Sequence, residues 1–69
     1  MLIWKDLTLE EQEQAERSYL SLLEDMAADG DEYDIVDYEM KRDNRNLRRE
    51  ALRYKLFIRD PDGYIFVKL

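Results

Sequence analysis

The chain contains no cysteine and no histidine, and it has only one proline and two glycines among its 69 residues. The lack of cysteine excludes disulfide bonds and thiolate metal sites as supports for a small fold. The lack of histidine removes the commonest zinc ligand and the usual general base near neutral pH. Neither a disulfide nor a thiolate-bound metal can therefore compensate for a small core.

Long apolar runs are absent as well. No stretch approaches the roughly 18 residues of a membrane span, and the N-terminal MLIWKDL is too short for the apolar region of a signal peptide. Hydrophobic residues make up 45% of the chain, enough for one small core although 41% of the residues are charged. We expect a single domain, residues 1–69, that is a complete small cytoplasmic protein without membrane contact.

Motifs for catalysis and metal binding are missing. The chain has no nucleophile elbow, phosphate-binding loop or dinucleotide fingerprint. The acidic run DGDEYDIVDYE, counted from Asp29, does not fit a calcium-binding EF-hand loop. Its sixth position is Asp34 and its twelfth is Met40, where that motif needs glycine and glutamate. We expect no enzymatic activity, no metal and no cofactor.

Charge is divided unevenly along the chain. Residues 1–40 carry thirteen acidic and two basic side chains (−11), and residues 41–69 carry four acidic and nine basic ones (+5), which sum to −6. Five of the bases lie in KRDNRNLRRE, residues 41–50. Two interpretations remain open: a polarised surface that orients partners, or an acidic helix and a basic sheet that neutralise each other within the fold.

A helix is predicted over residues 9–28. Thr8 and Glu11 form a capping box at its start. We expect Gly30 to end the helix in the left-handed conformation. Apolar side chains recur with helical spacing at Ala15, Tyr19, Leu22, Leu23 and Met26.

The remaining chain predicts three antiparallel strands. Apolar and charged residues alternate over residues 36–41 and again, for the most part, over residues 52–59, and the last strand, residues 64–69, follows the tight-turn sequence DPDG. Residues 47–56 also contain good helix formers, so a helix there is the competing interpretation. The predicted fold is α+β, with one N-terminal helix packed on a three-stranded antiparallel β-meander in the order α-β-β-β. LIW, residues 2–4, can add a short strand or cover an edge.

In the last hairpin we expect Arg59 to pair with Tyr64, which sets the two faces of the sheet. The face that packs on Leu22 and Leu23 would carry Leu56, Ile58, Ile65, Val67 and Leu69. The outward face would carry Phe57, Tyr64 and Phe66, flanked by Arg53, Lys55 and Arg59. KRDNRNLRRE would form the tip of a long hairpin, where Met40 pairs with Arg48.

These placements give the candidate binding residues. They are Arg45, Arg48, Arg49, Arg53, Lys55, Phe57, Arg59, Tyr64 and Phe66. Aromatic rings flanked by bases can bind protein or stack nucleic-acid bases, although residues 2–4 can instead cover the rings. A pI near 4.5 opposes phosphate binding.

We therefore expect a non-enzymatic small acidic protein-binding module or inhibitor that acts through a charge-polarised surface on a protein partner. Self-association into a homodimer is also expected, because short strands offer open edges and a small core gains from added burial. Two alternatives remain. One is a nucleic-acid-binding module that uses the aromatic and basic face, and the other is an inhibitor whose acidic helix mimics DNA.

Overall fold

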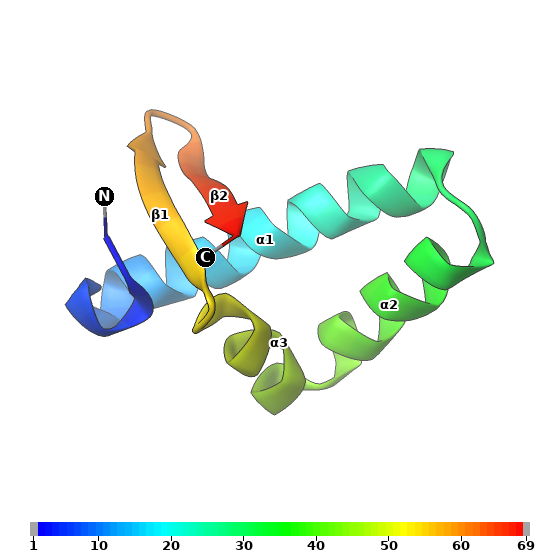
Figure 1. The fold of residues 1–69 in the computed structure, drawn as a ribbon, viewed down its shortest axis with the longest axis horizontal. Coiled ribbons are helices and arrows are strands. Elements are labelled where there is room, and N and C mark those ends of the chain that lie inside the picture. Colours follow the sequence, from blue (N-terminus) through cyan, green and yellow to red (C-terminus); the bar gives the residue numbers. More distant parts are fainter. Residues whose placement is uncertain (1, 69) are drawn as a thin grey trace.

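The computed structural model describes residues 2–68, and the expected position of Leu69 lies outside them. The chain forms a short 3-10 helix, η1 (Trp4–Asp6), the helices α1 (Leu9–Asp29), α2 (Glu32–Asp43) and α3 (Arg45–Leu52), and the strands β1 (Lys55–Asp60) and β2 (Gly63–Lys68). α2 returns antiparallel to α1, and the β1–β2 hairpin crosses α1 (Figure 1). The prediction of one helix on a three-stranded meander is wrong, because three helices precede a two-stranded antiparallel sheet.

α1 agrees with the helix predicted over residues 9–28, and its capping box is present. The Glu11 N–H donates to Thr8 Oγ1 at 3.2 Å, and the Thr8 N–H donates to Glu11 Oε1 at 3.2 Å. The helix ends before Gly30, but the φ of Gly30 is −96°, so the left-handed conformation predicted there is wrong. Glycine is needed for space instead, because an added Cβ would clash with the backbone carbonyl oxygen of Met26 and with the Asp34 side chain.

Residues 32–43 form α2 in place of the first predicted strand. The Asp31 carboxylate caps this helix by accepting a hydrogen bond from the Asp34 N–H at 3.2 Å. Acidic residues occupy its first turn and basic residues its last turn, and both arrangements favour the helix dipole. Lys41 Nζ lies 3.1 Å from Asp37 Oδ1 one turn away. The alternation of apolar and charged residues predicted a strand with one covered face. The apolar residues of α2 include none that is fully buried, so their alternation does not mark such a face.

Residues 45–52 form α3, so KRDNRNLRRE spans a helix end, a cap and a second helix rather than a hairpin tip. Asn44 caps α3 by accepting a hydrogen bond from the Leu47 N–H at 3.1 Å. The N-cap of this helix therefore lies three residues before Leu47, and the good helix formers of the stretch follow it. Leu52 anchors the helix because its side chain is fully buried. The expected pairing of residues 40 and 48 is wrong for the same reason.

The last hairpin and its register are confirmed. Arg59 pairs with Tyr64, and the strands are joined by a turn in which the Asp62 N–H donates to Asp60 Oδ1 at 3.0 Å. The N-terminal segment forms a single bridge to the other edge of β1, at Leu2, and not a full strand.

The core lies between η1, α1, α3 and one face of the hairpin. Its buried residues are Trp4, Leu7, Ala15, Tyr19, Leu23, Leu52 and Phe57. Tyr19 and Leu23 confirm the centre of the predicted stripe on α1, but Leu22 is 43% exposed and Met26 is 49% exposed. The expected burial of Leu22 is therefore wrong, and α1 presents a narrower apolar face to the core than its sequence indicated.

Candidate functional site

The arginines of α3 converge on one buried carboxylate. Glu16, in the middle of α1, is only 4% exposed. Arg45 donates to both of its carboxylate oxygens at 3.3 Å, and Arg48 Nε donates to Oε1 at 3.1 Å. Arg49 Nε lies 4.0 Å from Oε2. The three arginines, all predicted binding residues, thus neutralise a carboxylate inside the fold.

Arg49 makes two further contacts on the N-terminal side of the core. Its guanidinium carbon lies 5.3 Å from the centroid of the Trp4 ring, and its Nη2 donates to Gln12 Oε1 at 2.9 Å. A cation over an aromatic ring is stabilised by the ring's quadrupole. Arg49 therefore joins α3 to η1 and α1, and its charge is used in packing.

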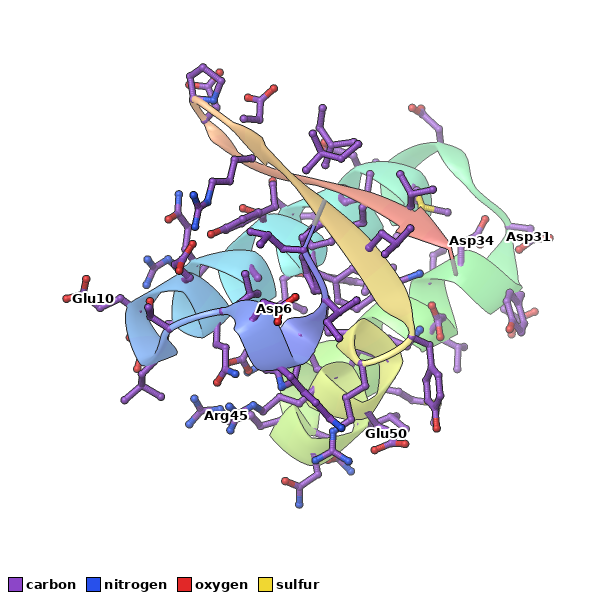
Figure 2. All side chains as sticks on the ribbon, turned by 60° about the vertical axis from the view of Figure 1, so that its left-hand side comes forward. Asp6, Glu10, Asp31, Asp34, Arg45 and Glu50 are labelled. Carbon is purple, nitrogen blue, oxygen red and sulfur yellow. The ribbon has the colours of Figure 1, made fainter. Side chains whose placement is uncertain are left out.

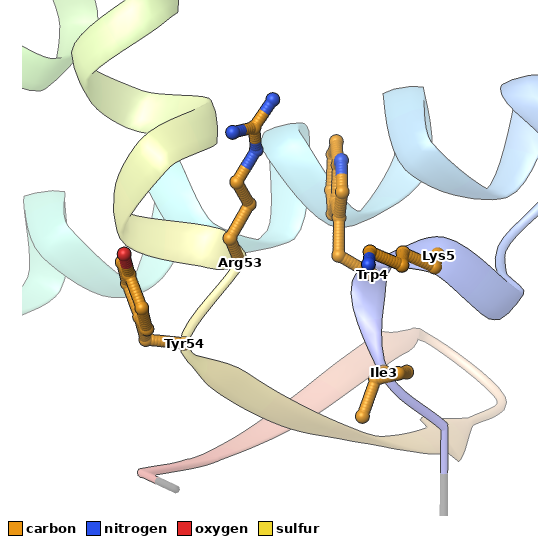
Figure 3. A pocket seen from close by; sticks show the side chains of 5 residues that line it. All are labelled: Ile3, Trp4, Lys5, Arg53 and Tyr54. Carbon is orange, nitrogen blue, oxygen red and sulfur yellow. The ribbon is translucent and has the colours of Figure 1, made fainter.

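Arg53 and the N-terminal segment line a common hollow beside Trp4 (Figure 3). Its lining residues are Ile3, Trp4, Lys5, Arg53 and Tyr54. Trp4 is 8% exposed, so its ring offers little area to a ligand. Arg53 Nη1 lies 3.4 Å from Glu50 Oε2 in an exposed pair. Of the two cations in the hollow, Lys5 is exposed and Arg53 is paired with Glu50.

Exposed acidic side chains are distributed around the molecule. In Figure 2, Glu10 at the start of α1 and Asp31 before α2 lie on opposite sides of the fold, and Arg45 and Glu50 lie together along a third side. These four residues thus do not separate into one acidic side and one basic side.

Arg59 and Tyr64, both expected on the outward face, bind Glu11 of α1. Arg59 Nη2 donates to Glu11 Oε2 at 2.6 Å, and the Tyr64 hydroxyl donates to the same oxygen at 2.9 Å. The Thr8 N–H, followed by these two donors, lowers the pKa of Glu11 to about 2. Burial, followed by the bond to Glu11, raises the pKa of Tyr64. This cluster fixes one face of the hairpin to the start of α1.

The aromatic residues of the hairpin face α1, so the predicted orientation of the sheet is wrong. Phe57 is fully buried, and its ring meets that of half-buried Phe66 with centroids 5.4 Å apart. Phe66 in turn lies 5.6 Å from Tyr19 of α1. Lys55 Nζ is 5.7 Å from the same Tyr19 ring. The predicted aromatic and basic residues of the hairpin are together in space, but they form the covered face.

The carboxylates of α1 explain this reversal. Glu11 stands four residues before Ala15 and eight before Tyr19, so all three lie on the covered stripe of the helix. A carboxylate on that stripe needs a donor from the sheet, and among the two faces only the one with Phe57 carries a cation within reach, at Arg59. This spacing places Glu11 on the covered stripe of α1, but the strand residue that it meets is supplied only by the tertiary structure.

The opposite face of the hairpin, which we call the outer face, is apolar and exposed. It consists of Leu56, Ile58, Ile65 and Val67, which form the cross-strand pairs Leu56–Val67 and Ile58–Ile65. Ile65 is 50% exposed, Val67 is 40% exposed and Ile58 is 37% exposed. Contiguous exposed apolar residues on a small domain indicate a contact surface. From the sequence we predicted that these residues pack on α1 in the core, and this surface was therefore not predicted.

The outer face borders an open strand edge on β2. The Leu2 N–H donates to the Phe57 carbonyl at 3.0 Å and the Phe57 N–H to the Leu2 carbonyl at 2.8 Å, so both groups of Phe57 point away from β2. Phe57 and Phe66 are therefore a non-hydrogen-bonded pair, and the alternation of an antiparallel ladder directs the backbone groups of Tyr64 and Phe66 to the far edge of β2. Within residues 2–68, no hydrogen bond from outside the hairpin reaches them.

A groove, which we call the edge groove, runs between α1 and β2. It is lined by Ser18, Ser21, Leu22 and Asp25 of α1 and by Asp60, Asp62, Gly63, Tyr64 and Ile65 of the hairpin. Exposed Leu22 and Ile65 are the apolar residues of its lining, and its three carboxylates are accompanied by no lysine or arginine. The edge groove thus combines apolar area, negative charge and unpaired strand backbone.

Comparison of the chain with protein-family models, with curated proteins and with solved structures found no match in any of the three. Among the described residues, no three Asp or Glu side chains come close enough to hold a metal ion. Over the same part of the chain, no helix has the length and apolar character needed to cross a membrane.

Proposed function

We propose that this chain is a non-enzymatic protein-binding module whose contact surface is the outer face of the hairpin together with the open edge of β2. The observation that supports the proposal is the coincidence of two features. Two cross-strand pairs of aliphatic residues lie on the uncovered face of the hairpin, and within residues 2–68 its edge strand β2 has backbone donors and acceptors without a hydrogen-bond partner. Strand edges of this kind bind extended segments of other proteins through main-chain hydrogen bonds.

The exposure of the outer face is costly for a domain of this size. Full burial of a valine or isoleucine side chain contributes roughly 1.5–3 kcal/mol. The side chains of Ile58, Ile65 and Val67 are each more than a third exposed, so a substantial part of that contribution is not realised in the isolated chain. A partner that covers the outer face would recover it.

A second exposed apolar hollow lies between α2 and α3, around Val36, Met40 and Leu47. Its backbone groups are already used in helical hydrogen bonds, so it offers side-chain contact alone. The hairpin is the better candidate because it adds directional main-chain bonds to apolar area.

The predicted alternatives have less support. Stacking of nucleic-acid bases needs accessible rings, but Phe57 is fully buried and Phe66 packs against Phe57 and against Tyr19 of α1. Mimicry of DNA by α1 would have to use its other carboxylates, because Glu11 and Glu16 are bound by arginines. We propose a non-enzymatic function because the chain has no histidine or cysteine. In addition, the carboxylates of Glu11 and Glu16 are held in these ion pairs.

Site-specific photo-crosslinking tests the proposal. The photoreactive residue benzoylphenylalanine is placed at Ile65, on the outer face, or at Tyr33, which is 76% exposed on α2 and serves as an aromatic control. We expect a discrete adduct in extract of the native host from position 65 and none from position 33. Adduct formation should fall when Ile58 and Val67 are also changed to serine. Equal adducts from both positions, or none from position 65, would contradict the proposal.

A further inference from the structure

The edge of β2 specifies the geometry of what it can bind. The outward N–H and C=O groups of Tyr64 and Phe66 lie two residues apart on one strand, which is the repeat that an added strand needs. The N–H of Ile65, by the same alternation, points back toward β1. An extended segment that pairs with the edge would therefore bond to residues 64 and 66 and leave residue 65 unchanged.

The side chains of such a segment would alternate between two environments. One row would continue the outer face beside Ile65 and Val67, and the other would point into the edge groove above Leu22. Leu22 is 43% exposed, so an apolar contact is available on the α1 side as well. Pairing at the edge would thus bury apolar area on both faces of the added strand.

The charge around the edge groove decides which segment fits. Asp25 lines the groove from α1, and Asp60 and Asp62 line it from the hairpin turn, with no cation among the lining residues. The whole chain has a net charge of −6. A second copy of the chain would bring the same carboxylates and the same net charge to the contact, so electrostatics disfavours a symmetric pair. A segment rich in lysine or arginine would be attracted instead.

We propose that the edge of β2 binds an extended basic segment of another protein as an added strand, with apolar side chains on the outer face and basic side chains near the carboxylates of the edge groove. This inference rests on the proposed function and names the chemistry of its partner. Steering by charge would raise the association rate, and the effect would decrease with salt.

Amide hydrogen exchange of the full chain tests the added strand directly. The probe is a synthetic peptide that alternates lysine and valine over seven residues, and its matched control alternates glutamate and valine. The lysine peptide should slow exchange at the Tyr64 and Phe66 amides in a saturable manner. The Ile65 amide, already directed at β1, should change little and serves as the internal control. Equal effects of both peptides, or protection elsewhere in the chain, would overturn the inference.

Paired charge variants test the role of the edge groove. D25N/D62N removes two groove carboxylates, and E10Q/E32Q removes two carboxylates at the starts of α1 and α2, so both raise the net charge by two. We expect D25N/D62N to weaken binding of the lysine peptide by about threefold to tenfold at low salt, and E10Q/E32Q to weaken it by less than about twofold. Equal weakening by the two variants would show attraction by net charge alone and overturn the assigned site.

Two further outcomes separate this inference from the proposed function. Sedimentation that shows dimers, with protection of the Tyr64 and Phe66 amides that depends on protein concentration, would assign the edge to a second copy and overturn the basic partner. Adduct formation from position 65 without binding of the lysine peptide would overturn the basic partner and retain the protein-binding function. Failure of both experiments would overturn both.

Discussion

Glu11 accepts hydrogen bonds from three elements of the fold: the Thr8 N–H of the cap, the Arg59 guanidinium of β1 and the Tyr64 hydroxyl of β2. All three favour the ionised carboxylate over the protonated one. The Glu11 side chain therefore both caps the start of α1 and holds the hairpin against this helix. Its ionisation state links the stability of the whole contact to pH.

We expect the variant E11Q to lose stability in a pH-dependent manner. The pKa of Glu11 is lowered from 4.5 to about 2 in the folded chain, so the contribution is fully present above about pH 4.5 and is lost as the pH falls toward 2. Urea unfolding at pH 7, pH 4 and pH 2.5 should show a difference between wild type and E11Q that shrinks at each step. E10Q, which changes an exposed carboxylate in the same turn, is the control and should show a smaller difference at pH 7. A difference for E11Q that does not depend on pH would contradict the assignment.

Leu22 and Leu23 give a matched comparison of burial on one helix. Leu23 is 6% exposed within the core, and Leu22 is 43% exposed at the edge groove. Leu23→Ala should lower the free energy of unfolding by about 2–5 kcal/mol through lost burial and cavity formation. Leu22→Ala should cost less than about 1 kcal/mol because water already reaches that side chain. Chemical denaturation of both variants measures the difference. Equal losses of unfolding free energy would show that the covered stripe of α1 has been assigned incorrectly.

At the scale of elements, the turn between β1 and β2 depends on Gly63. Its φ is 148°, a conformation that other residues rarely adopt, and a Cβ added there would meet Ser18 Oγ of α1. Gly63→Ala should therefore lower the free energy of unfolding by roughly 1–3 kcal/mol. The double variant S18A/G63A removes the hydroxyl contact and should keep most of that loss, because the backbone strain remains. Full recovery in the double variant, measured against S18A, would attribute the loss to the contact instead.

The elements also show where local patterns were sufficient. α1 and the DPDG hairpin were predicted correctly because a capping box, a helical stripe and a turn sequence act within a few residues. Residues 36–41 and 47–56 were predicted as strands, although Asp31 and Asn44 cap two helices in this part of the chain. Their apolar residues have a period compatible with a strand, and the choice between the two is made by caps and by contacts with α1.

At the scale of the whole molecule, Arg45, Arg48 and Arg49 carry the positive charge that lets Glu16 be buried. Changing all three to glutamine lowers the net charge from −6 to −9 and leaves Glu16 without a cation. Loss of a buried ion-pair partner costs about 3–5 kcal/mol, so the melting temperature should fall by more than about 10 °C. The fall should be larger at low ionic strength, where repulsion among the remaining acids is less screened.

The control for this prediction changes Arg17, Arg42 and Arg53 to glutamine. These exposed arginines give the same change of three charges, but none of them contacts Glu16 within the described residues. The control should share the salt dependence and show a fall of only a few degrees, since exposed pairs contribute roughly 0–1 kcal/mol each. Thermal melts at two salt concentrations measure both variants, and equal melting temperatures would refute the role of Glu16.

The sequence by itself determined what short-range physics controls: the start and length of α1, the turn at DPDG, the pairing of Arg59 with Tyr64, and the uneven division of charge. Only the tertiary structure decided which face of the hairpin is covered. Both faces alternate correctly for a half-buried strand, so periodicity cannot choose between Phe57 and Ile58. The choice depends on Glu11 and Tyr19, which lie far from the hairpin in the sequence. Glu11 binds Arg59 and the Tyr19 ring lies near Lys55, and both of these cations belong to the same face of the hairpin. Because that choice buries the rings, it also exposes the aliphatic pairs that form the candidate binding surface.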